Sequence, residues 1–231
     1  MVLPGAAIIP DSHPPLPNPL DTDPLALPFG ERRDAVHMAC KRLIDVVAAF
    51  SLLMLLAPLL VAIALAISIE SRGPVLFLQH RTGRGNRPFL IVKFRTMVVQ
   101  ENGGQVVQVS QGDPRVTRVG AILRRTSIDE LPQLLNVLAG SMSLVGPRPH
   151  ALSHDAYFSI RIAHYGRRFC VRPGLTGLAQ VSGLRGEVRN LDAMRHRVSA
   201  DLAYIHRWSL MLDLVLLWRT LRLIGRDRLA Y

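Results

Sequence analysis

The sequence predicts an α+β fold in which a small domain of helices and short strands follows a single membrane helix. Three features of the 231-residue chain indicate this fold class. One apolar run covers 43–69 and is longer than the roughly 20 residues that a spanning helix needs. Two short apolar runs, 74–78 and 88–92, flank a glycine-containing turn and predict a hairpin. Most of the chain after this hairpin alternates helical periodicity with turns rich in glycine and proline.

Composition and charge restrict the class of protein. Hydrophobic residues make up 49% of the chain, and 28 Lys and Arg outnumber 17 Asp and Glu. This balance indicates a membrane protein with a basic face or a protein that binds polyanions. Aromatic residues are only 6%, and neither a basic tail nor zinc-finger spacing is present, so we expect phosphate-bearing small molecules rather than nucleic acid as partners. Cys40 and Cys170 form no metal or redox motif and are expected to be free thiols.

The N-terminal segment, 1–37, is expected to be a disordered tail. Eight of the sixteen prolines fall within 1–30, and such a segment cannot form a helix and has little apolar surface to bury. A cleaved signal peptide would place its apolar core near the start of the chain. Here the apolar run begins only after Lys41 and Arg42, so we interpret it as a permanent membrane element.

The segment 38–72 is predicted to be a re-entrant membrane helix that breaks at Pro58 and returns to the same face. Proline removes a backbone hydrogen bond and bends a helix. Basic residues flank the apolar run on both sides: Arg32, Arg33, Lys41 and Arg42 precede it, and Arg72, Arg81, Arg84 and Arg87 follow it. The positive-inside rule then places both ends in the cytoplasm. An ordinary kinked transmembrane helix is the alternative, because proline is tolerated in such helices.

The segment 73–231 is expected to form one cytoplasmic domain. After the hairpin, the Gly- and Gln-rich stretch 98–112 predicts a mobile loop. The later elements are predicted to be helices at 119–123, 127–138, 151–169 and 191–205, a loop at 145–149, and a turn at 172–177 that leads into a strand at 178–181. The apolar end, 208–224, combines two tryptophans with nearby arginines, which favours a helix at the membrane interface. A packed amphipathic helix of the domain is the alternative.

An adjacent carboxylate pair, Asp129 and Glu130, is the main candidate for chemistry. A purely structural interpretation is a capping box, in which Ser127 starts a helix and Glu130 follows three residues later. However, Arg124 and Arg125 lie just upstream, and a helix start directs free N–H groups to the same place, so a diphosphate would be attracted there. A carboxylate among arginines stays ionised. It can then act as a nucleophile or bind magnesium, which takes one or two carboxylates plus phosphate oxygens.

Four stretches of sequence, in order and at suitable spacing, carry a family resemblance. They are 93–97 (Lys-Phe-Arg-Thr-Met), 124–136 around the carboxylate pair, 143–149 (Ser-Leu-Val-Gly-Pro-Arg-Pro) and 172–177 (Arg-Pro-Gly-Leu-Thr-Gly). Together they resemble the bacterial sugar transferase family, the polyprenyl-phosphate phosphoglycosyl transferases with a single re-entrant membrane helix. The resemblance covers 38–231. One such motif would be weak evidence, whereas four together are specific.

The resemblance implies a reaction and a role for each site residue. A sugar-1-phosphate would move from a nucleotide diphosphate-sugar to polyprenyl phosphate, with release of a nucleoside monophosphate. Asp129 would attack the phosphate that carries the sugar and form an aspartyl-phosphosugar, while Glu130 would hold Mg²⁺. The predicted phosphate- and substrate-binding residues are Lys93, Arg95, Arg124, Arg148 and Arg172. Their charges would stabilise the loose, negatively charged transition state.

Smaller features bear on the substrate. The stretch 184–187 (Leu-Arg-Gly-Glu) resembles the hexose-1-phosphate branch that starts exopolysaccharide repeats, so UDP-glucose or UDP-galactose and undecaprenyl phosphate are the expected substrates. Three positions depart from the family pattern. Leu178 stands where Trp is usual, Ala57 where Ser is usual and Val188 where Thr is usual. These departures affect interface anchoring or sugar contact, one helix-breaking hydroxyl and the choice of sugar, respectively.

The expected location is the bacterial inner membrane, with the catalytic domain on the cytoplasmic face. The expected partners are a UDP-sugar, polyprenyl phosphate and the membrane, and a homodimer is left open. The competing interpretation is a membrane-tethered protein that binds anionic lipid or nucleic acid through its arginines and performs no chemistry. That protein would bind less tightly as salt increases and would tolerate the loss of Asp129.

Overall fold

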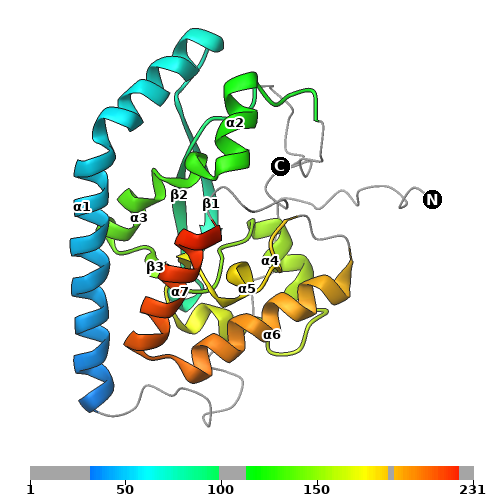
Figure 1. The fold of residues 1–231 in the computed structure, drawn as a ribbon. Coiled ribbons are helices and arrows are strands. Elements are labelled where there is room, and N and C mark those ends of the chain that lie inside the picture. Colours follow the sequence, from blue (N-terminus) through cyan, green and yellow to red (C-terminus); the bar gives the residue numbers. More distant parts are fainter. Residues whose placement is uncertain (1–31, 99–112, 187–189, 224–231) are drawn as a thin grey trace.

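The computed structural model describes residues 32–98, 113–186 and 190–223 (Figure 1). It contains helices and short strands, which confirms the α+β fold class. Residues 1–31 of the predicted N-terminal tail lie outside the described residues. Residues 32–37 are helical, so this part of the predicted tail is wrong. All of the predicted mobile loop except residue 98 also lies outside the described residues.

The apolar run forms one long helix, α1 (Arg32–Glu70), along one side of the molecule (Figure 1). Its 39 residues correspond to about 58 Å at 1.5 Å per residue. The helix continues through Pro58 without interruption, so the predicted break at this residue is wrong. Figure 1 shows instead that α1 bends along its length. A proline removes one hydrogen bond and bends a helix without necessarily ending it.

The predicted hairpin is confirmed, with longer strands than expected. β1 (Leu76–Thr82) pairs antiparallel with β2 (Pro88–Phe94), in a register that places Leu76 opposite Phe94. The short 3-10 turn η2 (Arg84–Asn86) joins the two strands. Its Gly85 has φ 66°, a left-handed conformation that glycine adopts without steric cost.

A second, parallel pair of strands was not predicted. β3 (Ser143–Val145) pairs with β4 (Gly174–Thr176), and the predicted strand 178–181 is instead the short helix α5 (Leu178–Val181). Glycines allow the two backbones to touch: a Cβ on Gly174 would lie 2.1 Å from the Gly146 nitrogen, and one on Gly146 would lie 2.5 Å from the Arg172 oxygen. The glycines of two sequence motifs are therefore needed for close backbone contact.

The helix predicted at 127–138 is divided by a 3-10 turn. α2 (Arg118–Thr126) ends at Ser127, whose φ is 60°, and η3 (Ile128–Glu130) and then α3 (Gln133–Ala139) follow. The predicted capping box is wrong, because the Ser127 side chain caps no helix and its Oγ accepts a hydrogen bond from Arg185 at 2.7 Å. Asp129 and Glu130 therefore lie in a tight turn between two helices.

The C-terminal part contains four further helical segments. The helix predicted at 151–169 is divided into α4 (Leu152–Ser159) and the 3-10 helix η4 (Tyr165–Cys170), because His164 adopts φ 60°. α6 (Leu191–Arg207) confirms the helix predicted at 191–205. α7 (Leu210–Leu223) follows directly after α6.

The main hydrophobic core lies between α1 and the rest of the domain. It joins residues of α1, α3, β2, β3, α6 and α7, among them Ala49, Leu53, Ile91, Leu134, Val137, Leu144, Tyr204 and Leu216. A second core packs α4 and η4 against α6, and a third packs the end of α1 against Phe94 and α2. α1 is thus an integral part of the fold.

Polar contacts hold α1 to the domain near both of its ends. Toward the N-terminal end, the Lys41 Nζ lies 2.6 Å from the Asp213 Oδ2, and the Asp45 Oδ1 accepts from the Leu144 N–H at 3.0 Å. At the C-terminal end, the Glu70 carboxylate accepts from the Val119 N–H at 3.1 Å. Both ends of α1 therefore contact the same globular domain.

Two helices expose broad apolar surfaces. Among the described helices, α1 is the one long and apolar enough to cross a membrane, and most of its apolar stretch is exposed. α7 buries Asp213 and Leu216 but exposes Met211, Leu214, Trp218 and Leu221. The Arg222 guanidinium lies 3.4 Å from the centre of the Trp218 ring. α7 therefore packs on the domain, as the second alternative predicts, and also presents an apolar face outward.

Candidate active site

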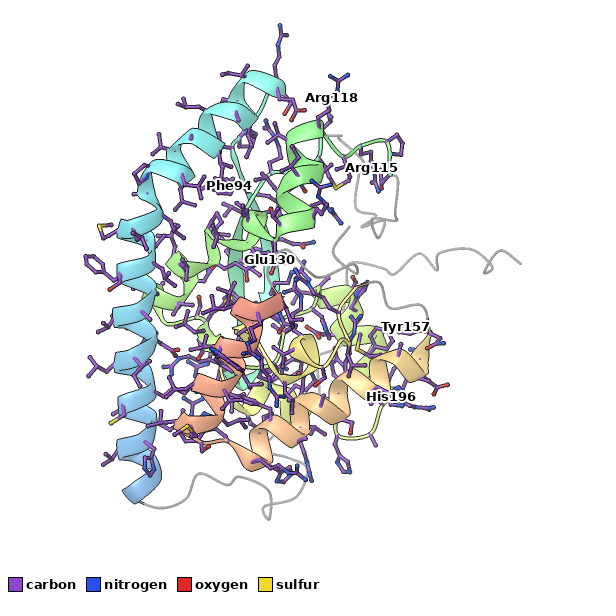
Figure 2. The ribbon with its side chains drawn as sticks, in the orientation of Figure 1. Phe94, Arg115, Arg118, Glu130, Tyr157 and His196 are labelled. Atoms are coloured by element: carbon purple, nitrogen blue, oxygen red, sulfur yellow. The ribbon has the colours of Figure 1, made fainter. Side chains whose placement is uncertain are left out.

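The carboxylate pair lies where three segments of the domain meet. η3 carries Asp129 and Glu130, β2 carries Lys93 near its end, and the loop after β3 carries Arg148. Glu130 lies near the centre of the molecule (Figure 2). The structure thus brings together residues from three of the four sequence motifs.

Glu130 is buried and is held by two cations. The Lys93 Nζ donates to Glu130 Oε1 at 2.9 Å, and Arg148 binds both oxygens, with its Nη1 donating to Oε2 at 2.9 Å and its Nη2 to Oε1. Although burial raises the pKa of Glu130, the charges and hydrogen bonds of Arg148 and Lys93 hold it well below its usual range. Glu130 is therefore ionised and rigidly oriented.

Asp129 has different surroundings, although it is the next residue. Within the part of the chain that the structure describes, its carboxylate makes no hydrogen bond or ion pair. It is partly exposed. Burial and the neighbouring charge of Glu130 raise its pKa to about 6, while Lys93, Arg148 and Arg124 act in the opposite direction. Asp129 is thus an unpartnered carboxylate surrounded by positive charge.

The 3-10 turn explains how neighbouring residues reach different environments. A 3-10 helix has three residues per turn, so successive side chains are separated by about 120°. Glu130 points inward to Lys93 and Arg148, while Asp129 stays partly exposed. The turn itself is fixed by the left-handed Ser127 before it and by Pro132 before α3.

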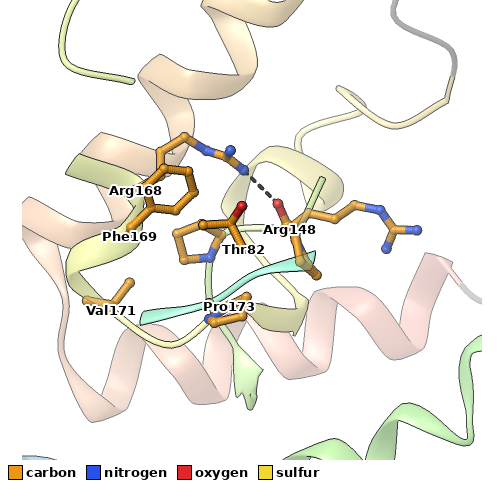
Figure 3. A pocket seen from close by; sticks show the side chains of 9 residues that line it. Thr82, Arg148, Arg168, Phe169, Val171 and Pro173 are labelled. Carbon is orange, nitrogen blue, oxygen red and sulfur yellow. Dashed lines mark hydrogen bonds between the residues drawn. The ribbon is translucent and has the colours of Figure 1, made fainter. Parts of the chain in front are cut away.

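The loop that carries Arg148 borders a small cavity (Figure 3). Its lining comes from the end of β1 and the residue after it, the loop after β3, η4, and the segment between η4 and β4: Thr82, Gly83, Pro147, Arg148, Pro149, Arg168, Phe169, Val171 and Pro173. In Figure 3 the Arg148 guanidinium extends away from the other lining side chains. The cavity therefore lies on the side of Arg148 that faces away from its guanidinium.

The other predicted substrate-binding arginines lie in different positions. Arg124 is in the last turn of α2, and its charge acts on Asp129. Arg95 is buried and donates to the Ser71 oxygen at 2.7 Å and the Pro74 oxygen at 2.6 Å, at the end of α1. The Arg172 Nε donates to the Gly140 oxygen at 2.9 Å, just after α3. The hydrogen bonds of Arg95 and Arg172 thus go to backbone carbonyls, and for Arg95 also to the Ser71 hydroxyl, and not to the carboxylate pair.

Arg81 also lies near the carboxylate pair, although the sequence motifs assign it no role in the site. It is on β1, and its Nη2 donates to Gln79 Oε1 at 2.5 Å. Burial and the charge of Arg148 lower the pKa of Arg81 to about 10, while Asp155 and Glu130 act in the opposite direction. The alternation of side chains along β1 could have indicated this position, because Gln79 and Arg81 share one face of the strand.

The carboxylate pair has the capacity to bind magnesium. Glu130 Oε1 accepts from both Lys93 and Arg148, but Oε2 accepts from Arg148 alone. Since each carboxylate oxygen has two acceptor sites, Oε2 and the unpartnered Asp129 carboxylate remain available. Magnesium needs only one or two protein carboxylates when phosphate oxygens complete its coordination. Among the described residues, no group of three or more His, Cys, Asp or Glu side chains could hold a metal ion.

Comparison with known proteins assigns the chain to a family. A family model described as bacterial sugar transferase matches residues 36–227. The chain is 60% identical to the UDP-glucose:undecaprenyl-phosphate glucose-1-phosphate transferase of Caulobacter vibrioides. The 180 matched residues cover 78% of this chain and 67% of that protein.

Two further relatives differ in length from this chain. A protein of the same name from Klebsiella pneumoniae is 46% identical over 192 residues, which cover 83% of this chain but 41% of that protein. The exopolysaccharide production protein PSS of Rhizobium leguminosarum bv. phaseoli is 43% identical over 191 residues, which cover 80% of this chain and 94% of that protein. The chain belongs to the bacterial sugar transferase family.

Proposed function

We propose that the protein transfers a hexose-1-phosphate from a UDP-sugar to undecaprenyl phosphate, as a first membrane step of exopolysaccharide or related glycoconjugate assembly. Glucose and galactose are the favoured sugars, and the names of the Caulobacter and Klebsiella relatives support glucose. The observation that carries the proposal is the asymmetry of the carboxylate pair. Glu130 is held by Lys93 and Arg148, whereas Asp129 is unpartnered among the described residues.

This asymmetry suits a nucleophile with its supporting electrostatics. In the first step, an Asp129 oxygen bonds to the phosphorus that carries the sugar, and the bond from that phosphorus to the bridging oxygen breaks, so that UMP leaves. The product is an aspartyl-phosphosugar. In the second step, an oxygen of undecaprenyl phosphate bonds to the same phosphorus and the Asp129 carboxylate leaves, which gives undecaprenyl-diphosphate-sugar.

The cations around Asp129 stabilise the phosphoryl group during both steps. Lys93, Arg148 and Arg124 each act on the charge of Asp129, so they surround the position where phosphorus would bind. Fixed positive charges of this kind need no rearrangement when charge develops in the transition state. Magnesium, held by Glu130, would neutralise the charge of the diphosphate when bound.

The position of α1 supports a location of the whole domain on one side of the bacterial inner membrane, and the basic residues that flank the apolar run support the cytoplasmic face. Lys41 near one end of α1 and Glu70 at the other bind the same globular domain. A helix that crossed the membrane would place these ends on opposite sides. An arrangement in which the continuous, bent α1 lies in the membrane with both ends at one face also brings the lipid phosphate to the domain.

A transfer assay tests the proposed reaction. The full chain in membranes is incubated with undecaprenyl phosphate, magnesium and a panel of labelled nucleotide-sugars, including UDP-glucose, UDP-galactose and UDP-N-acetylhexosamines. We expect label in the organic phase with UDP-glucose or UDP-galactose, and none with the Asp129→Asn variant. Absence of transfer with every donor, together with salt-sensitive binding of anionic lipid by both wild type and Asp129→Asn, would favour the non-enzymatic alternative.

A further inference from the structure

A buried arginine, Arg168, binds the backbone of the candidate active-site arginine directly. Its Nη2 donates to the Arg148 carbonyl oxygen at 2.6 Å, the contact drawn in Figure 3. Its Nε donates to Asp201 Oδ2 at 2.8 Å, and its Nη1 donates to the Tyr165 hydroxyl at 3.1 Å. Arg168 is 3% exposed and Asp201 is also 3% exposed, so neither side chain is a surface group.

The loop that carries Arg148 depends on donors from other segments. Pro147 and Pro149 on either side of Arg148 have no N–H group, so the loop offers acceptors more than donors. The Pro147 oxygen accepts from the Gly174 N–H at 2.9 Å, and the Arg148 oxygen accepts from Arg168. These two bonds hold the backbone immediately before and at Arg148.

Other elements fix the Arg168 side chain in turn. Asp201 belongs to α6, and the Tyr165 hydroxyl donates to Asp155 Oδ1 of α4 at 2.7 Å. The ring of His150 brings its Nδ1 to 3.1 Å from Arg168 Nη1. The guanidinium is therefore immobilised from several sides, and its fork geometry lets one residue connect several acceptors.

We propose that Arg168 is a positioning residue, which fixes the Arg148 backbone and thereby the contact between the Arg148 guanidinium and the Glu130 carboxylate. It does not touch the reacting atoms. Its role in the rate rests on the proposed transferase function, but its role in holding the loop does not. The competing interpretation is that Arg168 is only a structural ion-pair partner of Asp201, which would affect the fold and not Arg148 in particular.

A double-mutant cycle separates these interpretations. Arg168→Lys keeps the positive charge but cannot connect the same set of acceptors, so we expect kcat to fall at least tenfold. In an Arg148→Ala background, Arg168→Lys should change the remaining rate less than twofold, because the group that it positions is gone. An equal loss in both backgrounds would overturn the proposal. Arg161→Lys is the matched control, because the exposed Arg161 side chain makes its hydrogen bond and ring contact, among the described residues, with Tyr157.

Amide hydrogen exchange tests the same proposal without any activity. In Arg168→Lys, a peptide covering 143–152 should exchange at least fivefold faster than in wild type, while a peptide from α1 should not change. If Arg168→Lys does not fold, Asp201→Asn replaces it, since this near-isosteric change weakens the Arg168 anchor and leaves the arginine in place. Unchanged exchange in 143–152 would overturn the proposal. If wild type shows no transfer but Arg168→Lys shows the expected exchange pattern, only the proposed function is contradicted.

Discussion

At the scale of single residues, the surroundings of Asp129 and Glu130 shift the pKa values of the two carboxylates in opposite directions. Burial and the charge of Glu130 raise the pKa of Asp129 to about 6, whereas Arg148 and Lys93 overcome burial and hold the pKa of Glu130 well below its usual range. A carboxylate with a raised pKa and no ion-pair partner is a better nucleophile than one bound by two cations. The surroundings, and not the residue type, distinguish the two.

The pH dependence of the rate follows from the pKa of Asp129. Only the ionised carboxylate can attack phosphorus, so kcat/KM for the UDP-sugar should decrease as the pH falls through about 6. Initial rates measured between pH 5 and 8 at saturating lipid phosphate test this prediction. A constant kcat/KM down to pH 5 would show that no group with this pKa must be ionised.

Near-isosteric variants of the two carboxylates, Asp129→Asn and Glu130→Gln, should differ in their effect on stability. The pKa of Asp129 is raised in the fold, so its ionised form destabilises the protein above the unfolded pKa of about 3.9, and Asp129→Asn should unfold at an equal or higher temperature at pH 7.5. This advantage should disappear as the pH approaches 4. Glu130→Gln leaves Lys93 and Arg148 without their buried counter-charge and should cost about 3 kcal/mol.

Thermal unfolding of both variants in the same detergent checks this pair, and both should lose transfer activity. Equal melting temperatures for Asp129→Asn and Glu130→Gln at pH 7.5 would mean that the two carboxylates have equivalent surroundings, contrary to the structure. Arg195→Gln is a suitable control, because exposed Arg195 pairs with exposed Asp192 and with no other described acidic residue.

Sequence motifs indicated the site residues only in part. Lys93 and Arg148 meet at Glu130, as expected of residues from motifs that share a site. Arg95 comes from the same motif as Lys93 and Arg172 from the fourth motif, but both donate to backbone carbonyls. A motif shows that a position is an arginine, but the direction of its guanidinium depends on the elements packed around it. Arg81 was missed for the same reason, because its approach to Arg148 depends on the hairpin.

At the scale of elements, the hairpin and one long helix were predicted correctly, whereas the three-residue strands and the turns that divide two predicted helices were not. The hairpin and α6 have clear periodicity and turn residues, so both were correctly predicted. The three-residue strands β3 and β4 are too short for any periodicity to be visible. Their pairing depends on the contact between Gly146 and Gly174, which are distant in sequence. The left-handed Ser127 similarly overrides the capping-box pattern that its sequence context suggests.

The orientation of α1 can be tested with cysteine labelling. Asp34→Cys and Arg72→Cys, each in a Cys40→Ser/Cys170→Ser background, place one thiol before and one after the apolar run. Because both ends of α1 bind the same domain, both cysteines should react with an impermeant maleimide only after the inner membrane is permeabilised. Reaction of position 34 alone in intact spheroplasts would establish a spanning helix.

At the scale of the whole molecule, apolar surface and positive charge are distributed to suit a protein at a membrane. α1 and α7 expose large apolar side chains, and the chain has a formal net charge of +11. Anionic lipids attract such a charge, and the apolar faces then enter the acyl region. Because α1 also contributes to the main core, the membrane element and the globular domain should fold together.

The two tryptophans offer a test of how α7 meets the membrane. Trp218 is 52% exposed and stacks with Arg222, whereas Trp208 donates to Asp213 at 3.2 Å and is partly buried. In Trp208→Phe, the remaining Trp218 should be strongly quenched by brominated lipids in nanodiscs. In Trp218→Phe, the remaining Trp208 should be quenched less. Equal quenching in both variants would contradict an interfacial position for the exposed face of α7.

The central claim is that Asp129 forms a covalent bond to the sugar phosphate, and direct trapping tests it. The protein is incubated with magnesium and UDP-sugar labelled in the sugar, without undecaprenyl phosphate, then quenched and digested for mass spectrometry. We predict phosphosugar on the peptide that contains Asp129, one UMP released per site, and no adduct in Asp129→Asn. If this peptide stays unmodified and UMP is released only when undecaprenyl phosphate is added, transfer occurs in a single step and Asp129 is not the nucleophile.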